Sequence, residues 1–419
     1  MELLYILLVL LAATRIFGEL AVRLGQPALV GELISGILIG VLVHNFPEAF
    51  PSLIGLSDNE VFNGVTDLGV FFLMLFAGLE MHPRDLTKGS AVSISVAIGG
   101  MVIPLGLGFG LGWVFLPESP YRMAQSMFLG TALAITAVPV AIKILIDLNQ
   151  LESRVGQTIV SAAIVDDVLS LILLSVLTAL IRTGELLSLT ALALLIGQIV
   201  LFFVLTAAIG VYLLPKLEPL VKRLMGSEME FSLLILVALA FAVLAELLKM
   251  HFIIGAFVAG LFFNVRTLPE DTYEDVKGKV SALTKGLLAP IFFASIGLHL
   301  DLGALAVVPV FVCVLVGIAI AGKMIGSSLP ALAWRMSPRN SLAVGVAMSA
   351  RGAVELIIAD IALRAGLFSK PEPVPPVVAQ MFSAVVIMAI VTTLLTPIGL
   401  RLILPRSQTK DADDEPAPA

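Results

Sequence analysis

The stretch Val160–Ala179, VSAAIVDDVLSLILLSVLTA, carries the strongest information about the fold. It is long and apolar enough to cross a bilayer, for which about 20 residues are needed, yet Asp166 and Asp167 lie side by side near its middle. A charge in hydrocarbon is costly, so acidic residues at that depth are by default candidates for an ion or proton site. The stretch therefore predicts a membrane-spanning helix that handles cations or protons.

The composition of the whole chain is typical of a membrane protein. Hydrophobic residues make up 59% of the 419 residues and charged residues 13%, whereas an ordinary globular chain is about 25% charged and about 45–50% apolar. Most side chains must therefore face lipid or one another. Glu2 occupies the place of a signal peptide's basic segment and the apolar character continues past Arg15, so we expect a first span rather than a leader.

The residues that usually bind metals or cofactors are scarce. Cys313 is the only cysteine, which excludes an intrachain disulfide, and the four histidines show no zinc-binding spacing. We therefore expect no cofactor, no structural metal and no nucleic-acid partner. The segment 403–419 is polar and rich in Pro and Asp, so we expect a disordered cytoplasmic tail.

The number of spans and their orientation follow from hydropathy and charge. Spanning helices of about 20 apolar residues are expected at thirteen segments: 2–22, 28–46, 61–81, 89–115, 121–147, 154–181, 186–214, 228–248, 251–265, 281–299, 303–333, 340–364 and 374–402. The loops after odd-numbered spans, with the C-terminal segment, hold sixteen Lys and Arg residues, and the opposite loops hold four. By the positive-inside rule, the N-terminus lies outside and the C-terminus in the cytoplasm.

Three short landmarks recur in the same order in both halves of the chain. The matched pairs are Leu29–Gly36 with Ile253–Gly260, Phe76–Glu80 with Ser295–His299, and Gly130–Ala134 with Gly345–Ser349. The first two pairs join spans that are seven apart, so matching helices cross in opposite directions. This pattern predicts an inverted repeat, the plan of many secondary transporters.

The acidic pair needs partners inside the helix bundle. Consecutive residues on a helix point about 100° apart, so Asp166 and Asp167 cannot share one partner symmetrically. One can face a pathway while the other reaches a neighbouring helix. Lys323 lies centrally in the span 303–333, too far from either end to reach water easily, so it needs an acidic partner, and an Asp is the natural candidate.

Two spans carry residues that interrupt a helix. Pro139 lacks a backbone donor and clashes with the carbonyl of Ile135, which predicts a break at about Thr136. Arg351 beside Gly352 predicts an interruption at the matching place of the second repeat. Broken helices at corresponding positions bring partial charges and free carbonyls to a midplane site, so they indicate where the ion binds.

Other conspicuous residues inside the spans are interpreted as structural. Ion pairs are expected between the acidic residues Glu32, Asp67, Glu246 and Asp360 and the basic residues Arg15, Arg351 and Arg364. Arg351 and Glu355 have the i, i+4 spacing of helical ion pairs and could neutralise each other. The glycines at 106, 108, 110 and 112 lie in an apolar span, so they indicate close helix packing rather than a nucleotide-binding loop.

Five motifs together resemble a known family. They are LGTALAITAVPVAIKIL from Leu129, AAIVDDVLSL from Ala162, LAPIFFASIGLHL from Leu288, IAGKMIGS from Ile320 and MSARGAVELIIA from Met348. Between about Pro27 and Pro397 the chain resembles the cation/proton antiporter superfamily, monovalent cation:proton antiporter 2 branch, and most of all bacterial sodium/proton antiporters of the two-aspartate, NapA-like kind.

The resemblance implies an architecture and a set of site residues. It implies a thirteen-helix homodimer with an interface part (1–81 and 228–299), an ion-binding core part (89–181 and 303–402) and a linking helix (186–214). Asp167 would coordinate the cation and Asp166 would pair with Lys323. Two broken helices, one with Pro139 and the other with Ser349, Arg351 and Glu355, would cross behind this pair and place Thr131 and Thr136 near the ion. Relatives often have Glu directly after the Arg-Gly, where this chain has Ala353.

The chemistry of the residues agrees with this resemblance. Hard cations such as Na⁺ prefer oxygen ligands, which a carboxylate, Thr hydroxyls and unwound carbonyls supply. We expect a transporter, not an enzyme, in which Na⁺ or Li⁺ and protons compete for Asp167 during alternating access, with electrogenic exchange if Lys323 also releases a proton. A K⁺/H⁺ antiporter or K⁺ efflux system, and a non-transporting membrane sensor or receptor, are the open alternatives. An aspartyl protease is disfavoured, because adjacent residues on one helix cannot converge on one peptide bond.

Overall fold

The computed structural model describes residues 2–56, 59–81, 90–136, 142, 145–146, 150–151, 153–183, 189–213, 229–263 and 270–404. Every regular element in these residues is helical, and no strand occurs among them. The prediction of an all-α membrane protein is therefore confirmed. Pro139 and the predicted tail from residue 405 onward lie outside the described residues.

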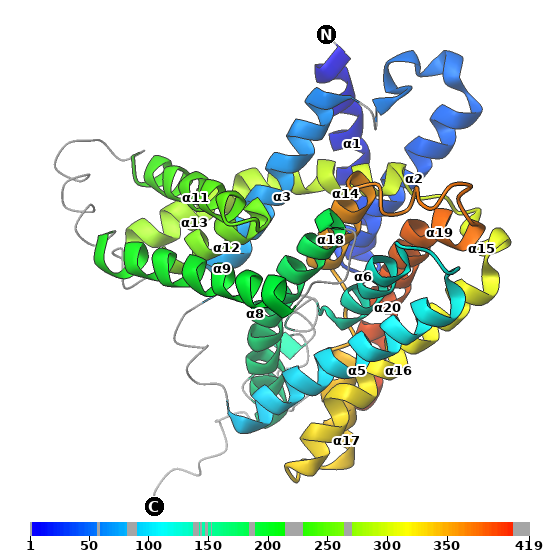
Figure 1. Ribbon diagram of the computed structural model, residues 1–419. Helices are drawn as coiled ribbons and strands as arrows, with labels where there is room; N and C mark the ends of the chain where they lie inside the picture. The colour runs from blue at the N-terminus through cyan, green and yellow to red at the C-terminus, as the bar shows by residue number, and fades with distance from the viewer. Residues whose placement is uncertain are drawn as a thin grey trace, which may run out of the picture.

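The helices follow one another along the chain as Figure 1 shows. The first half contains α1 (Glu2–Arg23), α2 (Ala28–Asn45), η1 (Pro47–Ala49), η2 (Pro51–Leu53), α3 (Glu60–Glu80), α5 (Ala91–Phe115), α6 (Arg122–Ala134), α8 (Arg154–Thr183), α9 (Leu189–Ala208) and the π-helix η4 (Ile209–Leu213). The second half contains α11 (Met229–Leu247), α12 (Phe252–Phe262), α13 (Glu270–Leu283), the π-helix η5 (Thr284–Leu288), α14 (Ala289–Leu298), α15 (Ala304–Val307), α16 (Pro309–Ala333), α17 (Pro338–Ala347), α18 (Ala353–Arg364), α19 (Pro376–Ala379) and α20 (Met381–Ile403).

Eight helical segments of the described chain are long and apolar enough to cross a membrane, and three shorter apolar helices accompany them. These eleven overlap eleven of the thirteen predicted spans. The two predicted spans that match none of these eleven helices are 121–147 and 340–364, which are the two for which the sequence predicts a break. The total of thirteen spans stays a prediction.

Both predicted interruptions have a counterpart in the backbone. Helix α6 ends at Ala134, and Ile135 is extended with φ −79° and ψ 149°. In the second repeat, α17 ends at Ala347 and α18 begins only at Ala353, after Gly352 in an extended conformation. Neither span is a continuous helix, so backbone polar groups are exposed inside the protein at both places.

The helix contacts have the symmetry of the repeated landmarks. Helix α2 packs on α14, and α3 packs on α12. The landmarks pair α2 with α12 and α3 with α14. Exchanging each helix for its repeat partner therefore turns the α2–α14 contact into the α12–α3 contact. The same relation links the α5–α6 contact to the α16–α17 contact. In Figure 1, α5 and α16 run side by side. This packing agrees with the inverted repeat.

The alternating glycines of α5 have two different environments. A Cβ atom on Gly108 would lie 2.7 Å from the Cα of Gly130, and one on Gly112 would lie 2.7 Å from the Cα of Ser126, both on α6. Gly106 has open space at the same position. One side of this helix therefore needs glycine for close approach to α6, as in other membrane helix pairs, and the other side does not.

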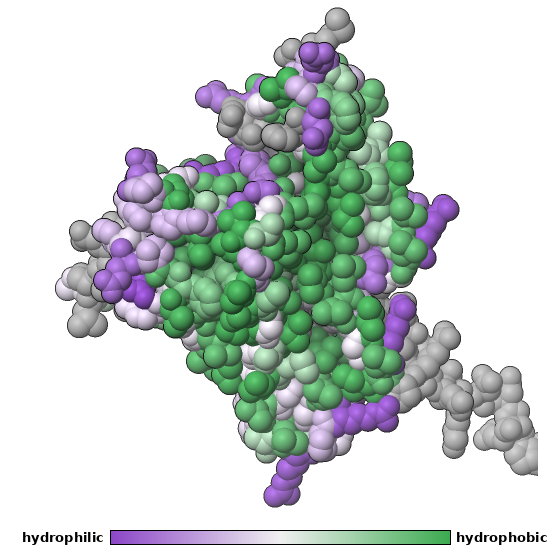
Figure 2. Space-filling model, turned by 90° about the vertical axis from the view of Figure 1, so that its right-hand side faces the viewer, coloured by the Kyte–Doolittle hydropathy of each residue, from purple (hydrophilic) through white to green (hydrophobic). Residues whose placement is uncertain are grey.

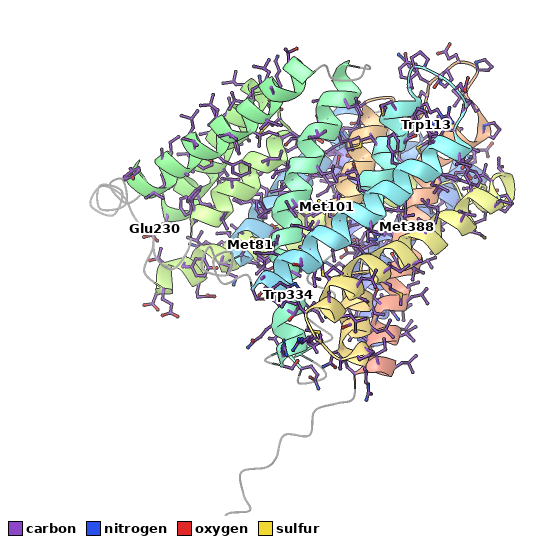
Figure 3. The ribbon with its side chains drawn as sticks, turned by 60° about the horizontal axis from the view of Figure 1, so that its bottom comes forward. Met81, Met101, Trp113, Glu230, Trp334 and Met388 are labelled. Atoms are coloured by element: carbon purple, nitrogen blue, oxygen red, sulfur yellow. The ribbon has the colours of Figure 1, made fainter. Side chains whose placement is uncertain are left out.

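The surface has the character expected of a protein in lipid. Figure 2 shows a broad hydrophobic face, with hydrophilic residues mainly at its margins. Trp113 and Trp334 lie near opposite ends of the α5–α16 pair (Figure 3). Trp is enriched at both membrane–water boundaries, so we infer that each of these two residues lies at one of the two boundaries. The guanidinium of Arg122 lies 4.4 Å from the centre of the Trp113 ring.

Candidate ion-binding site

A fully buried ion pair of the described chain joins α8 to α16. The Lys323 Nζ lies 3.3 Å from the Asp166 Oδ1, and both side chains have 0% exposure. Lys323 also donates a hydrogen bond to the backbone carbonyl of Ala134, the last residue of α6. The lysine therefore links three helices of the two repeats at the level where α6 breaks.

Asp167 follows Asp166 on α8 and is only partly buried. Among the described residues, no hydrogen bond or ion pair reaches its carboxylate. Because the lysine is committed to Asp166 and to a carbonyl, Asp167 keeps its oxygens for another ligand. The two adjacent carboxylates thus have the different environments that their 100° separation on the helix predicts.

Arg351 occupies the broken end of α6. Its guanidinium donates hydrogen bonds to the carbonyls of Ala132 (2.8 Å), Leu133 (2.6 Å) and Ile135. A helix that ends leaves its last carbonyls without helical partners and has a partial negative charge there. The two buried cations Arg351 and Lys323 therefore donate hydrogen bonds to the free backbone carbonyls at this end of α6.

The backbone of the second break is held in turn by α20. Thr393 donates from its hydroxyl to the carbonyl of Arg351 at 2.9 Å. This contact fixes the interrupted segment between α17 and α18, so the guanidinium is presented to α6 from a supported backbone. The sequence contains no local signal for Thr393, because its partner lies 42 residues away.

Glu355 lies in the first turn of α18 with its side chain fully buried. The nearest atoms of the Arg351–Glu355 ion pair, Nε and Oε2, are 3.7 Å apart. Neither carboxylate oxygen has a hydrogen-bond partner among the described residues. The i, i+4 pair suggested by the sequence is therefore present, but it is looser than the bonds that Arg351 makes to α6.

The remaining candidate residues differ in what their hydroxyls can do. Thr131 donates to the Met127 carbonyl of its own helix at 2.8 Å, and Ser349, just past the end of α17, donates to the Gly345 carbonyl of α17 at 2.8 Å. Thr136 lies just past the end of α6 with 2% exposure, and its hydroxyl has no partner among the described residues. Of the three, Thr136 is the one whose hydroxyl makes no hydrogen bond in the described chain.

This chain is similar to known membrane proteins over most of its length. The family model described as "Sodium/hydrogen exchanger, transmembrane" matches residues 6–406. The chain belongs to this sodium/hydrogen exchanger family. The Na(+)/H(+)-K(+) antiporter GerN of Bacillus cereus is 32% identical over 390 residues, covering 93% of this chain and 92% of its own length.

Two further relatives agree with this membership. The high-affinity Na(+)/H(+) antiporter NhaS3 of a Synechocystis species is 29% identical, over 98% of this chain and 92% of that protein. The solved structure of the sodium proton antiporter MjNhaP1 from Methanocaldococcus jannaschii matches with a TM-score of 0.61 and 18% identity, over 96% of this chain and 97% of that chain. The family resemblance predicted from the motifs is therefore confirmed, and the last comparison adds the fold.

Proposed function

We propose that this protein exchanges Na⁺ or Li⁺ for H⁺ across the cell membrane by alternating access, with Asp167 as the cation-binding carboxylate. The observation that carries the proposal is the environment of the acidic pair. Asp166 is neutralised by Lys323, whereas the Asp167 carboxylate next to it has no such partner in the described chain. Family membership and the names of its antiporter relatives support the same exchange.

Ion exchange requires a single site that binds either Na⁺ or a proton, but not both at once. Na⁺ would be held by the carboxylate of Asp167 and the hydroxyl of Thr136, with Thr131 nearby on α6 and backbone carbonyls at the break as further oxygen donors. A proton on the same carboxylate removes the charge that attracts the cation. If only the loaded forms reorient across the membrane, the protein exchanges the two ions without a leak.

Lys323 offers a route to electrogenic exchange. When Na⁺ arrives at Asp167, its positive charge lies close to the ammonium group and favours release of a proton from the Lys323 Nζ. The proton from Asp167 and the proton from Lys323 then leave for one incoming Na⁺. Each cycle moves one net charge, so the rate depends on the membrane potential.

The movement would separate two sets of helices. The core part (89–181 and 303–402) would move against the interface part (1–81 and 228–299), with 186–214 as the link and the interface part forming a homodimer. The packing supports this division, since α5, α6, α8, α16, α17, α18 and α20 contact one another extensively, as do α1, α2, α3, α11, α12, α13 and α14. The N-terminus would lie outside and the C-terminus in the cytoplasm.

The proposal is tested in proteoliposomes that hold an imposed pH gradient. A pH-sensitive dye reports the collapse of the gradient when Na⁺, Li⁺ or K⁺ is added, and the Asp167→Asn variant is measured in parallel. Collapse by Na⁺ or Li⁺ that disappears in the variant supports the exchange and its site. A response to K⁺ alone would instead indicate a K⁺/H⁺ antiporter, and no response to any of these ions would favour a sensor or receptor.

A further inference from the structure

Arg364, the last residue of α18, reaches across to α3. Its Nη1 lies 3.2 Å from the Asp67 Oδ1, and its Nη2 donates a hydrogen bond of 2.7 Å to the hydroxyl of Thr66. Its Nε bonds to the Asp360 Oδ2 of its own helix at 2.8 Å. One guanidinium therefore serves three acceptors, two on α3 and one on α18, which the planar fork of arginine allows and a lysine does not.

The elements that Arg364 joins belong to different sets of helices. Helix α3 packs on α12 and α14, whereas α18 packs on α6 and α20. At another place on this boundary the contact is mostly apolar. A small cavity there is lined by Leu29, Val30 and Leu33 of α2, by Gly352 just before α18, and by Leu356, Ala389, Ile390 and Thr393 of α18 and α20. Apolar surfaces can slide without breaking directional bonds, but the bonds of Arg364 have directions and distances to keep.

The charges around Arg364 favour a contact that can open and close. Asp67 is 51% exposed and Arg364 is 34% exposed, so water can replace their mutual bond. Asp360 is only 7% exposed and lies one helical turn before Arg364 on α18, so it stays with the arginine when α18 moves. His299, which follows α14, and Asp67 of α3 are the other ionisable groups that act electrostatically on Asp360. The Arg364–Asp67 bond to α3 is thus the weaker of the two ion pairs, whereas the Arg364–Asp360 bond within α18 persists when α18 moves.

We propose that Arg364, with Asp67 and Thr66, is a latch that holds the core part against the interface part in one end state and opens during each transport cycle. The latch rests on the proposed alternating-access function. By the proposed orientation it lies towards the outer side of the membrane, since α3 begins there and α18 ends there.

The latch is tested by linking its two sides. Cys313 is first replaced (Cys313→Ser), and Asp67→Cys is combined with Arg364→Cys. A short bifunctional thiol reagent that contains a reducible disulfide then joins the two cysteines. We expect Na⁺-driven proton movement in proteoliposomes to fall at least tenfold on linking and to return when the linker is reduced.

A matched control uses a second ion pair on α3. The Lys285 Nζ lies 3.6 Å from the Glu80 Oε1, and both side chains are exposed. These residues belong to α3 and η5, which pack together within the interface part. Linking Glu80→Cys to Lys285→Cys with the same reagent should leave transport unchanged.

The outcomes separate the latch from the proposed exchange. Unchanged transport after verified linking of the Asp67 and Arg364 positions overturns the latch, while the exchange stands. Absence of transport in the unsubstituted protein counts against the exchange itself.

A double-variant series gives a second measurement that does not depend on the linker. Asp67→Asn, Arg364→Gln and their combination should change the Na⁺ concentration for half-maximal exchange by one common factor of about two- to fivefold, the range for a partly exposed pair. Separate effects that multiply in the double variant would show that the two residues act independently, which also overturns the latch.

Discussion

Replacing Lys323 with methionine tests whether the pair with Asp166 supports both the fold and the charge movement. The two groups are 3.3 Å apart and fully buried. At an effective dielectric constant of about 20, unit charges at that distance attract by about 5 kcal/mol. Removing one partner of a buried pair typically costs about 3–5 kcal/mol, because the other charge is left uncompensated. We therefore expect Lys323→Met and Asp166→Asn each to lower the free energy of unfolding by about this amount.

The coupling between the two residues follows from a double-variant cycle. The combination Asp166→Asn/Lys323→Met buries no isolated charge, so it should be more stable than the sum of the single effects predicts, by about 2–5 kcal/mol. Equilibrium unfolding in mixed detergent micelles, followed by helical circular dichroism, measures these values. A coupling below about 0.5 kcal/mol, which is the usual error of additivity, would refute the reasoning.

The same variants separate stability from transport. Variants that lack Lys323 have no second proton to release, so any Na⁺/H⁺ exchange that they retain should lose its response to membrane potential. The comparison is made in proteoliposomes with a potassium–valinomycin potential of either sign. Exchange that keeps its full voltage response without Lys323 would contradict the proposed role of the lysine.

Three further predictions concern neighbouring residues. Arg351→Gln should destabilise the protein and abolish exchange, and Arg351→Lys should not restore it, because one ammonium group cannot replace the guanidinium on three carbonyls; a lysine variant with full activity would contradict this. Gly108→Leu should lower stability by about 1–3 kcal/mol or more through overpacking, whereas Gly106→Leu, which meets open space, should change it little; equal melting temperatures for the two variants would count against the packing argument. Thr136→Val should raise the Na⁺ concentration for half-maximal exchange more than Thr131→Val, because the Thr136 hydroxyl lies at the break itself and makes no hydrogen bond in the described chain; the reverse order in proteoliposomes would move the ion away from the break.

The fold could be predicted to a large extent because membrane insertion is governed by local composition. Segments of about 20 apolar residues are read directly from the chain, and the two predicted spans with a break are the two that match none of the eleven apolar helices. The predicted position of the first break is also close to the observed one, since α6 ends two residues before Thr136. Pro139, on which that prediction rested, lies outside the described residues, so its own conformation is not part of this agreement.

The candidate site could be predicted only in part. A charged residue deep in an apolar span requires a partner, and this requirement was enough to expect a bond between Lys323 and an aspartate. The i, i+4 spacing likewise suggested the Arg351–Glu355 pair, yet the stronger bonds of Arg351 go to carbonyls of α6 more than 200 residues away. Backbone carbonyls are present at every residue, so no sequence pattern distinguishes those that a distant side chain will bind.

The sequence by itself determined that the chain is a helical membrane protein with buried charges and two interrupted spans, because those properties depend on neighbouring residues. The tertiary structure alone decided which partner each buried charge takes. Asp166 and Asp167 are identical in type and adjacent in sequence, but only Asp166 faces Lys323, since the rotation of α8 against α16 turns one carboxylate to the lysine and the other away. Helix rotation is set by packing between distant segments, so the difference in environment between the two aspartates exists only in the folded protein.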